Sequence, residues 1–406
     1  MQYDYDVVII GAGMVGASLA CAIAHSGLRI AIIESVVLSN KQESSYDDRG
    51  ITLSPSSRRI LEQIGVWQLL QSKTSPITKI HISEQGRFGF THLDASETSN
   101  TELGHVAVAR SLGQSLHKRM SGFDNVKLIC PAELKHFQRT DVGMRLEISY
   151  SDNTETLTTG LLVGADGSRS LVRRLAGINT KERDFKQTAI VSNVTSQKPN
   201  NATAFERFTQ HGPFALLPID KNRSVSVLTV DQDNAERYLT MADEQYIKAI
   251  ETEFGRRLGR VEHIGQRRSY PIVFIEAIEQ YQQQLILLGN AAHTLHPNAA
   301  QGFNLGLRDV AGLAECIFAG IEKGLGLDEI CILENYIKLR HADQQCVMRF
   351  SNGLASSFYN QLPLLAPTRN FVMLLLDSIP DLKAAFAEKS MGIAGLQPRL
   401  VRGQQL

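Results

Sequence analysis

Three glycines near the start of the chain stand at the spacing of a phosphate-binding turn. Gly11, Gly13 and Gly16 give the pattern G-x-G-x-x-G directly after the β-rich run 5–10. The first glycine permits a tight turn, the second lets the backbone approach a pyrophosphate, and the third lets a helix pack closely on a strand. Glu34 lies 18 residues after Gly16, where its carboxylate can accept hydrogen bonds from a ribose diol. The pattern predicts an adenine dinucleotide site and leaves NAD and FAD both open.

Two later turns place polar groups at the ends of apolar runs. One run ends in G-A-D-G, which contains Asp166, and another ends in G-N-A-A-H, which begins with Gly289 and Asn290. A carboxylate at the carboxyl end of a strand lies at the ligand edge of an α/β sheet, although Asp166 can instead cap the helix that follows. Arg49, beside Gly50, can meet a phosphate or a flavin edge, or belong to a charged surface turn.

A fourth stretch, HPNAAQGFNLGLRD at 296–309, sets an apolar loop directly before a helix. Apolar residues then recur at i, i+3 and i+4, which predicts a helix over about 304–324 with Asn304 as its N-cap. The N-terminus of such a helix favours negative charge. Ala300 stands where a glycine is expected, and we predict a negative φ there, because a left-handed alanine costs roughly 1 kcal/mol.

These turns need strands and helices to position them. Residues 17–26 favour a helix that Gly27 ends, and residues 28–33 favour the second strand of a βαβ unit. Further strand-like runs, which we assign to a mostly antiparallel sheet, are 79–84, 189–194 and 224–230.

Composition narrows the classes of protein. Lys plus Arg and Asp plus Glu both number 42, and this neutral balance argues against nucleic-acid binding. Five scattered cysteines without a C-x-x-C pair are typical of a reduced, cytoplasmic protein, and we expect no metal site. Residues 7–24 carry no charge, yet the acidic start and the interrupting glycines favour the βαβ unit over a signal peptide or a membrane anchor.

Together these motifs resemble a known enzyme family. The three glycine turns are similar to those of the class A flavin monooxygenases of the p-hydroxybenzoate hydroxylase fold. The pattern HP-x-A-x-QG-x-N-x-G-x-x-D at 296–309, the stretches 205–208 and 212–218, and Met391-Gly392 narrow the resemblance to the ubiquinone-biosynthesis hydroxylases. The likeness covers nearly the whole chain. It implies FAD as the cofactor and NAD(P)H as a transient reductant.

The resemblance also implies a role for each motif position. The residues implied to hold FAD are Gly11, Gly13, Gly16 and Glu34 at the ADP half, Arg49 near the flavin, Arg110 and Gln114 at the ribityl–phosphate region, Asp166 at the pyrophosphate region and in NAD(P)H use, Asn290 at the ribityl chain or pyrophosphate, and Gly289 beside it. The loop implied to line the flavin ring, where we expect the chemistry, contains Pro297, Gly302, Phe303 and Asn304. Asn290 replaces the aspartate of many family members, and an amide can still accept a hydrogen bond from a ribityl hydroxyl.

The organisation implied is a discontinuous, Rossmann-like FAD-binding domain with an inserted antiparallel-sheet substrate domain. The FAD-binding parts are 1–75, 102–180 and 285–350, the substrate domain is 76–101 and 181–284, and a helical C-terminal region is 351–406. The residues expected around the substrate are Phe208, Gly212, Pro213, Leu217, Tyr270 and Pro271, with Phe214 and Leu216 as further candidates. Each of these can instead be ordinary core.

One segment raises the question of a membrane. Residues 354–376 are apolar but interrupted by Pro363 and Pro367, so they cannot span a bilayer as one helix. They can rest at the inner face of a membrane, dock on a partner in a biosynthetic complex, or pack on the domain itself or in a dimer.

The implied activity is hydroxylation of a polyprenyl phenol of ubiquinone biosynthesis. NAD(P)H would reduce the FAD, O2 would form a C4a-hydroperoxide on it, and the apolar phenol would take the distal oxygen atom. His293 and His296 show no acid partner in the sequence, so we expect structural roles for them. The ring carbon stays open, as do a non-catalytic flavoprotein scaffold and a simple NAD dehydrogenase.

Overall fold

The computed structural model of the chain describes residues 3–37, 49–87, 90–98, 101–141, 143–150, 153–297, 300–359, 392 and 395–406, with side chains for all of these except 354–359. In this part of the chain the strands form three sheets. None of the helices described has both the length and the apolar character needed to cross a bilayer.

The first sheet contains the predicted βαβ unit. Its strands are β1 (Tyr5–Ile10), β2 (Ile30–Ile33), β8 (Val126–Ile129), β9 (Ala132–Thr140), β10 (Gly143–Tyr150), β11 (Asn153–Gly164), β18 (Tyr281–Gln282) and β19 (Leu285–Leu287). The main order is β18-β19-β11-β1-β2-β8, and β9 and β10 continue from β11 as an antiparallel hairpin. β1 pairs parallel with β2 and β11, so the turns after these strands emerge at one edge. Its last four residues, 7–10, are buried and apolar, which is typical of a central parallel strand.

Helices cover this sheet and connect its strands. They are α1 (Met14–Ile23), α4 (Ala109–Met120), α5 (Leu171–Leu175), α8 (Gln301–Glu322) and α9 (Ile330–Tyr359), with short 3-10 turns η1 (Ala24–Ser26) and η5 (Gly289–Ala291). Gly27 ends the first helical segment at φ 77°, as predicted. α8 begins at Gln301, so the prediction that Asn304 is its N-cap is wrong.

The second sheet is the predicted, mostly antiparallel insertion. Its strands, in order, are β20 (His293–Thr294), β17 (Arg268–Ala277), β12 (Thr180–Ser196), β15 (Arg223–Asp231), β14 (Gly212–Pro218), β13 (Thr203–Thr209), β5 (Lys79–Glu84) and β6 (Phe90–Asp94), with β16 (Val261–Ile264) paired to β12. The helices beside it are α6 (Ala235–Thr240) and α7 (Asp243–Phe254). Phe214 and Leu216 pack in the same core as Tyr246 and Ile250 of α7.

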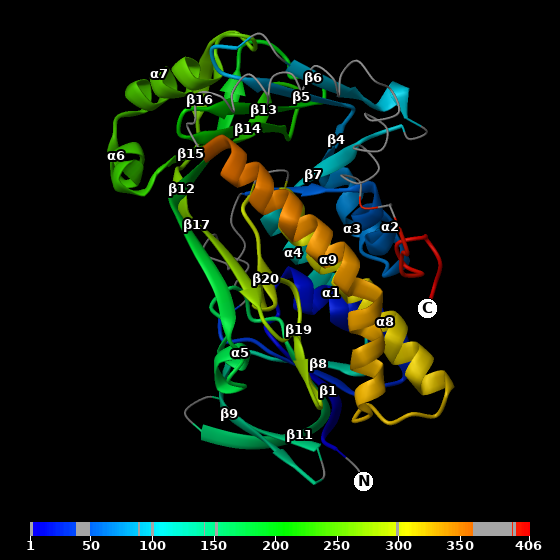
Figure 1. The fold of residues 1–406 in the computed structure, drawn as a ribbon. Coiled ribbons are helices and arrows are strands. Elements are labelled where there is room, and N and C mark those ends of the chain that lie inside the picture. The colour runs from blue at the N-terminus through cyan, green and yellow to red at the C-terminus, as the bar shows by residue number, and fades with distance from the viewer. Residues whose placement is uncertain are drawn as a thin grey trace.

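A small third sheet lies between the other two. It consists of β3 (Gly50–Leu53), β7 (Gly104–Val108) and β4 (Thr74–Ile77), and α2 (Pro55–Gln63) and α3 (Trp67–Leu70) follow β3. In Figure 1, β1, β8 and β11 lie toward one end of the molecule, whereas β5, β6 and α7 lie at the other. The long helix α9 runs from beside α8 toward the second sheet (Figure 1). The predicted fold class is thus confirmed.

The domain boundaries remain a proposal. We propose the parts 76–101 and 181–284 as the substrate domain, with β20 as a short extension of its sheet from the FAD-binding part. α9 carries the chain into the expected C-terminal helical region as far as Tyr359. Residues 395–406 form turns, so that end of the region is not helical as predicted. The apolar segment 354–376 falls mostly outside the described residues.

Candidate functional site

The first glycine turn is closed at two positions and open at one. Gly11 has φ 101°, and a Cβ added there would lie 2.6 Å from the carbonyl oxygen of Ala165. A Cβ on Gly16 would overlap the carbonyl oxygen of Gly11. At Gly13, in contrast, no atom of the residues that the structure describes lies within 4 Å of the position that a Cβ would take. Within the part of the chain that the structure describes, no side chain caps α1, so the N–H groups of its first turn are available to a ligand in that open space.

Two side chains hold the peptide group inside this turn. The backbone N–H of Ala12 donates to Oε2 of Glu34 over 2.8 Å, and the N–H of Val36 donates to Oε1 over 2.8 Å. On the other side, Nε2 of His117 donates to the carbonyl oxygen of Ala12 over 2.8 Å. Sequence reasoning found Glu34 but missed His117, which lies 105 residues from Ala12 with no local signal to connect them.

His117 also shows which face of α4 meets the turn. Arg110, Gln114 and His117 are four and three residues apart, so they share one face of this helix. α4 packs on α1, and the contact from His117 to Ala12 turns that face toward the glycine turn. Gln114 is exposed and Arg110 is half-buried. The structure therefore gathers these predicted residues beside the glycine turn.

Asp166 follows β11, and both interpretations of it have support. Its Oδ2 accepts hydrogen bonds from the backbone N–H groups of Leu171 (2.7 Å) and Val172 (3.1 Å), so it caps the start of α5. Its Oδ1 is buried and has no hydrogen-bond partner among the described residues. A purely structural cap leaves that second oxygen unexplained, since buried polar atoms are nearly always bonded.

The third glycine turn brings α8 against α1. Gly289 has φ 56°, and a Cβ there would lie 2.9 Å from Cγ2 of Val15. A Cβ on Gly306 would lie 3.0 Å from the same methyl group and 3.5 Å from Cα of Gly289. The glycines thus let three segments converge near the N-terminus of α1. Asn290, within the turn, is exposed.

The side chain of Asn304 connects the start of α8 to neighbouring segments by hydrogen bonds. Its Oδ1 accepts from the N–H of Ser54 (2.9 Å) and the hydroxyl of Ser57 (2.6 Å). Its Nδ2 donates to the carbonyl oxygens of Thr52 (2.9 Å) and Ala300 (2.8 Å). The side chain is therefore an anchor inside the first turn rather than a cap. Its amide ties α8 to β3 and to the N-terminus of α2.

Comparison with known proteins identifies this arrangement. A family model described as "FAD binding domain" matches residues 4–351. The ubiquinone hydroxylase UbiL of Rhodospirillum rubrum is 34% identical over 99% of this chain and 93% of its own. The 3-demethoxyubiquinol 3-hydroxylase of Escherichia coli is 28% identical over 96% and 98%. This chain belongs to the FAD-binding monooxygenase family.

The same fold is present in solved structures. The p-nitrophenol 4-monooxygenase of Pseudomonas putida superposes with a TM-score of 0.81 at 17% identity, over 97% of this chain and 100% of that one. The anhydrotetracycline hydroxylase OxyS of Streptomyces rimosus gives 0.74 at 20% identity, over 97% and 77%. The cofactor of this monooxygenase is FAD, as predicted.

The residues present fit that cofactor. The open space at Gly13 suits a pyrophosphate. At Gly302, near the start of α8, no described atom lies within 4 Å of a Cβ position either. The unpartnered Oδ1 of Asp166 is a further group that a ligand can satisfy. Phe303 is half-buried against the main core, and Pro297 is exposed just before the loop. Asn298 and Ala299 lie outside the described residues.

Ala300 contradicts our prediction of a negative φ. It has φ 48° and ψ 37°, in the left-handed region. The chain reverses there to enter α8, and the bond from Asn304 to the Ala300 carbonyl oxygen holds the strained peptide in place. Backbone strain of this kind persists where the surroundings over-determine it.

Ala300→Gly should therefore relax the loop of this monooxygenase. Relief of left-handed strain, about 1 kcal/mol, is partly offset by the greater chain entropy of glycine. We expect the free energy of unfolding to rise by less than about 1 kcal/mol and FAD to dissociate more slowly. Urea denaturation and stopped-flow release of FAD measure the two effects.

Ala202→Gly is the matched control, because Ala202 is also left-handed (φ 54°) but lies in the turn just before β13. It should relieve similar strain without changing FAD dissociation. Faster loss of FAD from the Ala300→Gly protein would contradict the strain argument.

The predicted substrate residues divide between faces of the second sheet. Phe214 and Leu216 belong to the core beside α7, so the ordinary-core interpretation holds for both. Leu217, the next residue on β14, packs instead against the cluster that contains Val106. Phe208 pairs with Pro213, and Gly212 is buried at φ 134°.

Tyr270 meets the FAD-binding part directly. The Arg49 guanidinium carbon lies 4.4 Å from the Tyr270 ring centroid, which joins the small third sheet to β17. Tyr270 packs at the edge of a cluster with Leu305 of α8. Pro271 is exposed and, as the next residue of a strand, points to the other face. The structure therefore brings Arg49 and Tyr270 together and separates Pro271 from them.

A buried network of charged and polar side chains joins His293, which lies before the cofactor loop, to α8 and α9. Nε2 of His293 donates to Oδ2 of Asp309 over 2.5 Å, and Oδ1 accepts from Arg340 and Gln344, each over 3.0 Å. His293, Asp309 and Arg340 are all 0% exposed. The expectation that His293 has no acid partner is wrong, although its burial supports a structural role.

The network continues to a second ion pair. Asp343 accepts from Nη2 of Arg340 (2.6 Å) and from Nε of Arg308 (2.8 Å). Burial raises the pKa of Asp309, but His293 and Arg340 outweigh it and hold the pKa below its usual range. His296 is also buried and makes an edge contact with Phe185, with ring centroids 4.9 Å apart.

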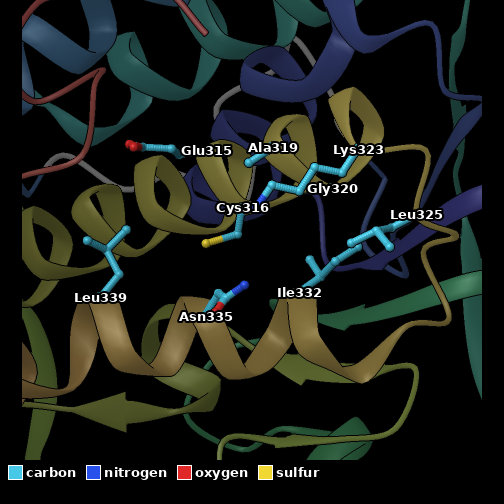
Figure 2. A pocket seen from close by; sticks show the side chains of 9 residues that line it. All are labelled: Glu315, Cys316, Ala319, Gly320, Lys323, Leu325, Ile332, Asn335 and Leu339. Carbon is cyan, nitrogen blue, oxygen red and sulfur yellow. The ribbon is translucent and has the colours of Figure 1, made fainter.

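A crevice at the far end of α8 is separate from this site. Figure 2 shows it between α8 and the start of α9, with Cys316 and Asn335 extending from opposite helices. Its volume is about 160 Å³. Burial raises the pKa of Cys316 to about 12, so its thiol stays protonated. The crevice borders the C-terminal half of α8, whereas the cofactor loop joins the N-terminal end.

Proposed function

We propose that this chain hydroxylates a polyprenyl phenol of ubiquinone biosynthesis, consuming NAD(P)H and O2, with a 2-polyprenyl-6-methoxyphenol as substrate. The observation that carries the proposal is the convergence of two helix starts, each with an open glycine, Gly13 at α1 and Gly302 at α8. Ubiquinone hydroxylases among the relatives, which align along almost the whole chain, support the substrate class.

Different turns and helices of the chain would bind different parts of the cofactor. The N–H groups at the start of α1 would hold the pyrophosphate, and Glu34 would bind the ribose hydroxyls while keeping the Ala12 peptide oriented. The shared face of α4 would contact the ribityl–phosphate region through Arg110 and Gln114. Asn290 would meet the ribityl chain.

The start of α8 would serve the flavin ring. The N–H groups near Gly302 and Phe303 lie at the positive end of a 22-residue helix, so they would stabilise negative charge on the reduced ring. When bound, FAD supplies the hydride acceptor and the site at which O2 is activated. The backbone contributes electrostatic stabilisation and Asn304 fixes its position.

The second sheet would supply the substrate wall. Phe208, Pro213, Leu217 and Tyr270 offer apolar and aromatic surface that can exclude water from the reacting centre. The Arg49 contact with Tyr270 would hold this wall at the flavin edge. An apolar wall suits a prenylated phenol, whose ring is activated by its own hydroxyl group.

Steady-state turnover tests the proposal. Purified FAD-loaded protein is given NADH or NADPH with a short-chain prenylated methoxyphenol, and products are separated by liquid chromatography. We expect the phenol to accelerate reductant oxidation and to yield one hydroxylated product, whose position identifies the ring carbon.

Two outcomes would reject the proposal. If the phenol increases only peroxide production, the chain does not couple oxygen to this substrate. If bound FAD stays oxidised with both reductants and the phenol present, a non-catalytic flavoprotein scaffold is the better description.

A further inference from the structure

A second cavity lies far from the glycine turns, at the outer edge of the second sheet. Its volume is about 400 Å³. Its lining residues come from β5, β6, β13, the segment before β13 and the segment after α7. In Figure 1, β5, β6 and α7 lie at the end of the molecule opposite β1. The charged and aromatic residues that line it are Lys79, His81, His92, Lys198, Phe205 and Arg257. None of the residues predicted for FAD or for the substrate lines it.

The charged residues that line this edge cavity are all basic. Among the described residues that line it are three cationic side chains and two histidines but no acidic residue. Lys79 is balanced by Asp94, with Nζ 3.0 Å from Oδ2. Lys198 and Arg257 are exposed, and neither side chain has a hydrogen bond or ion pair with any described residue. Two cations therefore border the cavity without a counter-charge.

A buried histidine pair forms part of the wall. His81 is 3% exposed, and its Nδ1 lies 2.6 Å from Nε2 of His92 on the neighbouring strand. Nε2 of His81 is buried and has no hydrogen-bond partner among the described residues. Burial, Arg257 and His92 lower the pKa of His81 to about 4. Positive charge from Arg257 adds to the larger effect of burial and disfavours protonation of His81.

The rim is strained and firmly supported. Asn201 and Ala202 are both left-handed, with φ 51° and 54°. Nδ2 of the buried Asn200 donates to the carbonyl oxygens of Asp220 (2.7 Å) and Arg223 (3.1 Å), and its Oδ1 accepts from the N–H of Ala202 (3.1 Å). Two consecutive left-handed residues are unfavourable, and they persist only where surrounding bonds enforce them. The loop that carries Lys198 is thus pre-formed.

We propose that this edge cavity binds a phosphate monoester, with Lys198 and Arg257 on the phosphate and the organic part against Phe205 and Leu258. A dianion would supply the missing counter-charge for two cations. The cavity has space for more than the phosphate group, and its apolar floor suits an organic residue. This site goes beyond the proposed hydroxylation and does not depend on it.

Calorimetric titration of the FAD-loaded full chain with inorganic phosphate, at constant ionic strength, tests the site. We expect Lys198→Ala/Arg257→Ala to weaken phosphate binding by at least about 10-fold, because the variant removes both cations that would contact the phosphate. Arg260→Ala, an exposed arginine outside the lining, is the matched control and should bind as the wild type does. FAD content should be equal in all three proteins, which shows that the variants fold.

Further arms identify the source of the phosphate. NADPH and NADH differ only by a phosphate monoester, so tighter binding of NADPH that disappears in the double variant assigns the site to a phosphorylated nucleotide. Binding to phosphatidic acid vesicles but not to phosphatidylcholine vesicles, lost in the same variant, assigns it to a lipid headgroup. If the double variant loses inorganic phosphate binding and neither the NADPH effect nor the vesicle effect is seen, the site is assigned to a free phosphate ester. No phosphate binding by the wild type, or equal binding by the double variant, overturns the proposal.

Discussion

Gly13→Asp should give a folded protein that no longer retains FAD. The Cβ position of Gly13 is open and its φ is −64°, so a side chain is tolerated by the protein itself. The new carboxylate would occupy the space in front of α1 and face the pyrophosphate. Two like charges about 4 Å apart repel by roughly 4 kcal/mol at an effective dielectric constant near 20, so affinity should fall by more than about 100-fold.

The measurement is flavin absorbance of the purified protein, followed by titration of apoprotein with FAD. Gly13→Ala is the control, because a methyl group fits the same space without adding charge, and its affinity should fall much less. Circular dichroism should show wild-type secondary structure for both variants. FAD bound with wild-type affinity by Gly13→Asp would remove the first glycine turn from the cofactor site.

Asp309→Asn should destabilise the chain more than any surface substitution. It removes the negative charge that His293 and Arg340 share, and it leaves the buried Arg340 with only Asp343. Loss of one partner of a buried ion pair costs about 3–5 kcal/mol, because the remaining charge stays desolvated. Urea denaturation should show a lower midpoint with an unchanged slope.

Glu322→Gln is the matched control, since Glu322 is exposed at the end of the same helix. It should change the unfolding free energy by less than about 0.5 kcal/mol.

The pKa of Asp309 is lowered in the folded state, so the stability contributed by its charge is complete above the unfolded value near 4 and is lost as pH falls through the folded value. The free energies of unfolding of the wild type and the Asp309→Asn protein should therefore converge at low pH. Equal midpoints at neutral pH would show that the network contributes little.

Local patterns predicted the glycine turns well. The βαβ unit from Tyr5 to Ile33 is encoded by contiguous residues: apolar strand, three glycines, helix and stop at Gly27. The strand 79–84 was predicted with its observed ends, because it is short and bounded on both sides. Strands such as β12 run well beyond the predicted 189–194, since their polar ends are extended by pairing with β17 rather than by their own composition.

Long-range contacts account for the features that the sequence could not predict. The start of α8 is set by the bonds of Asn304 to Ser54 and Thr52, about 250 positions away in the chain, and these override its capping preference. The same bonds hold Ala300 in a conformation that its type disfavours. His117 and the acid partner of His293 were missed for this reason too, because each pairing depends on how two helices pack.

Turnover under oxygen-18 gas tests the central claim most directly. The FAD-loaded chain, NADPH or NADH, and a prenylated methoxyphenol are incubated with labelled O2 in ordinary water, and the product is analysed by mass spectrometry. We predict a hydroxylated phenol that carries one labelled oxygen atom, with the other atom released as water. A product without the label, or unchanged phenol beside labelled peroxide, would contradict the assignment of this chain as a phenol hydroxylase.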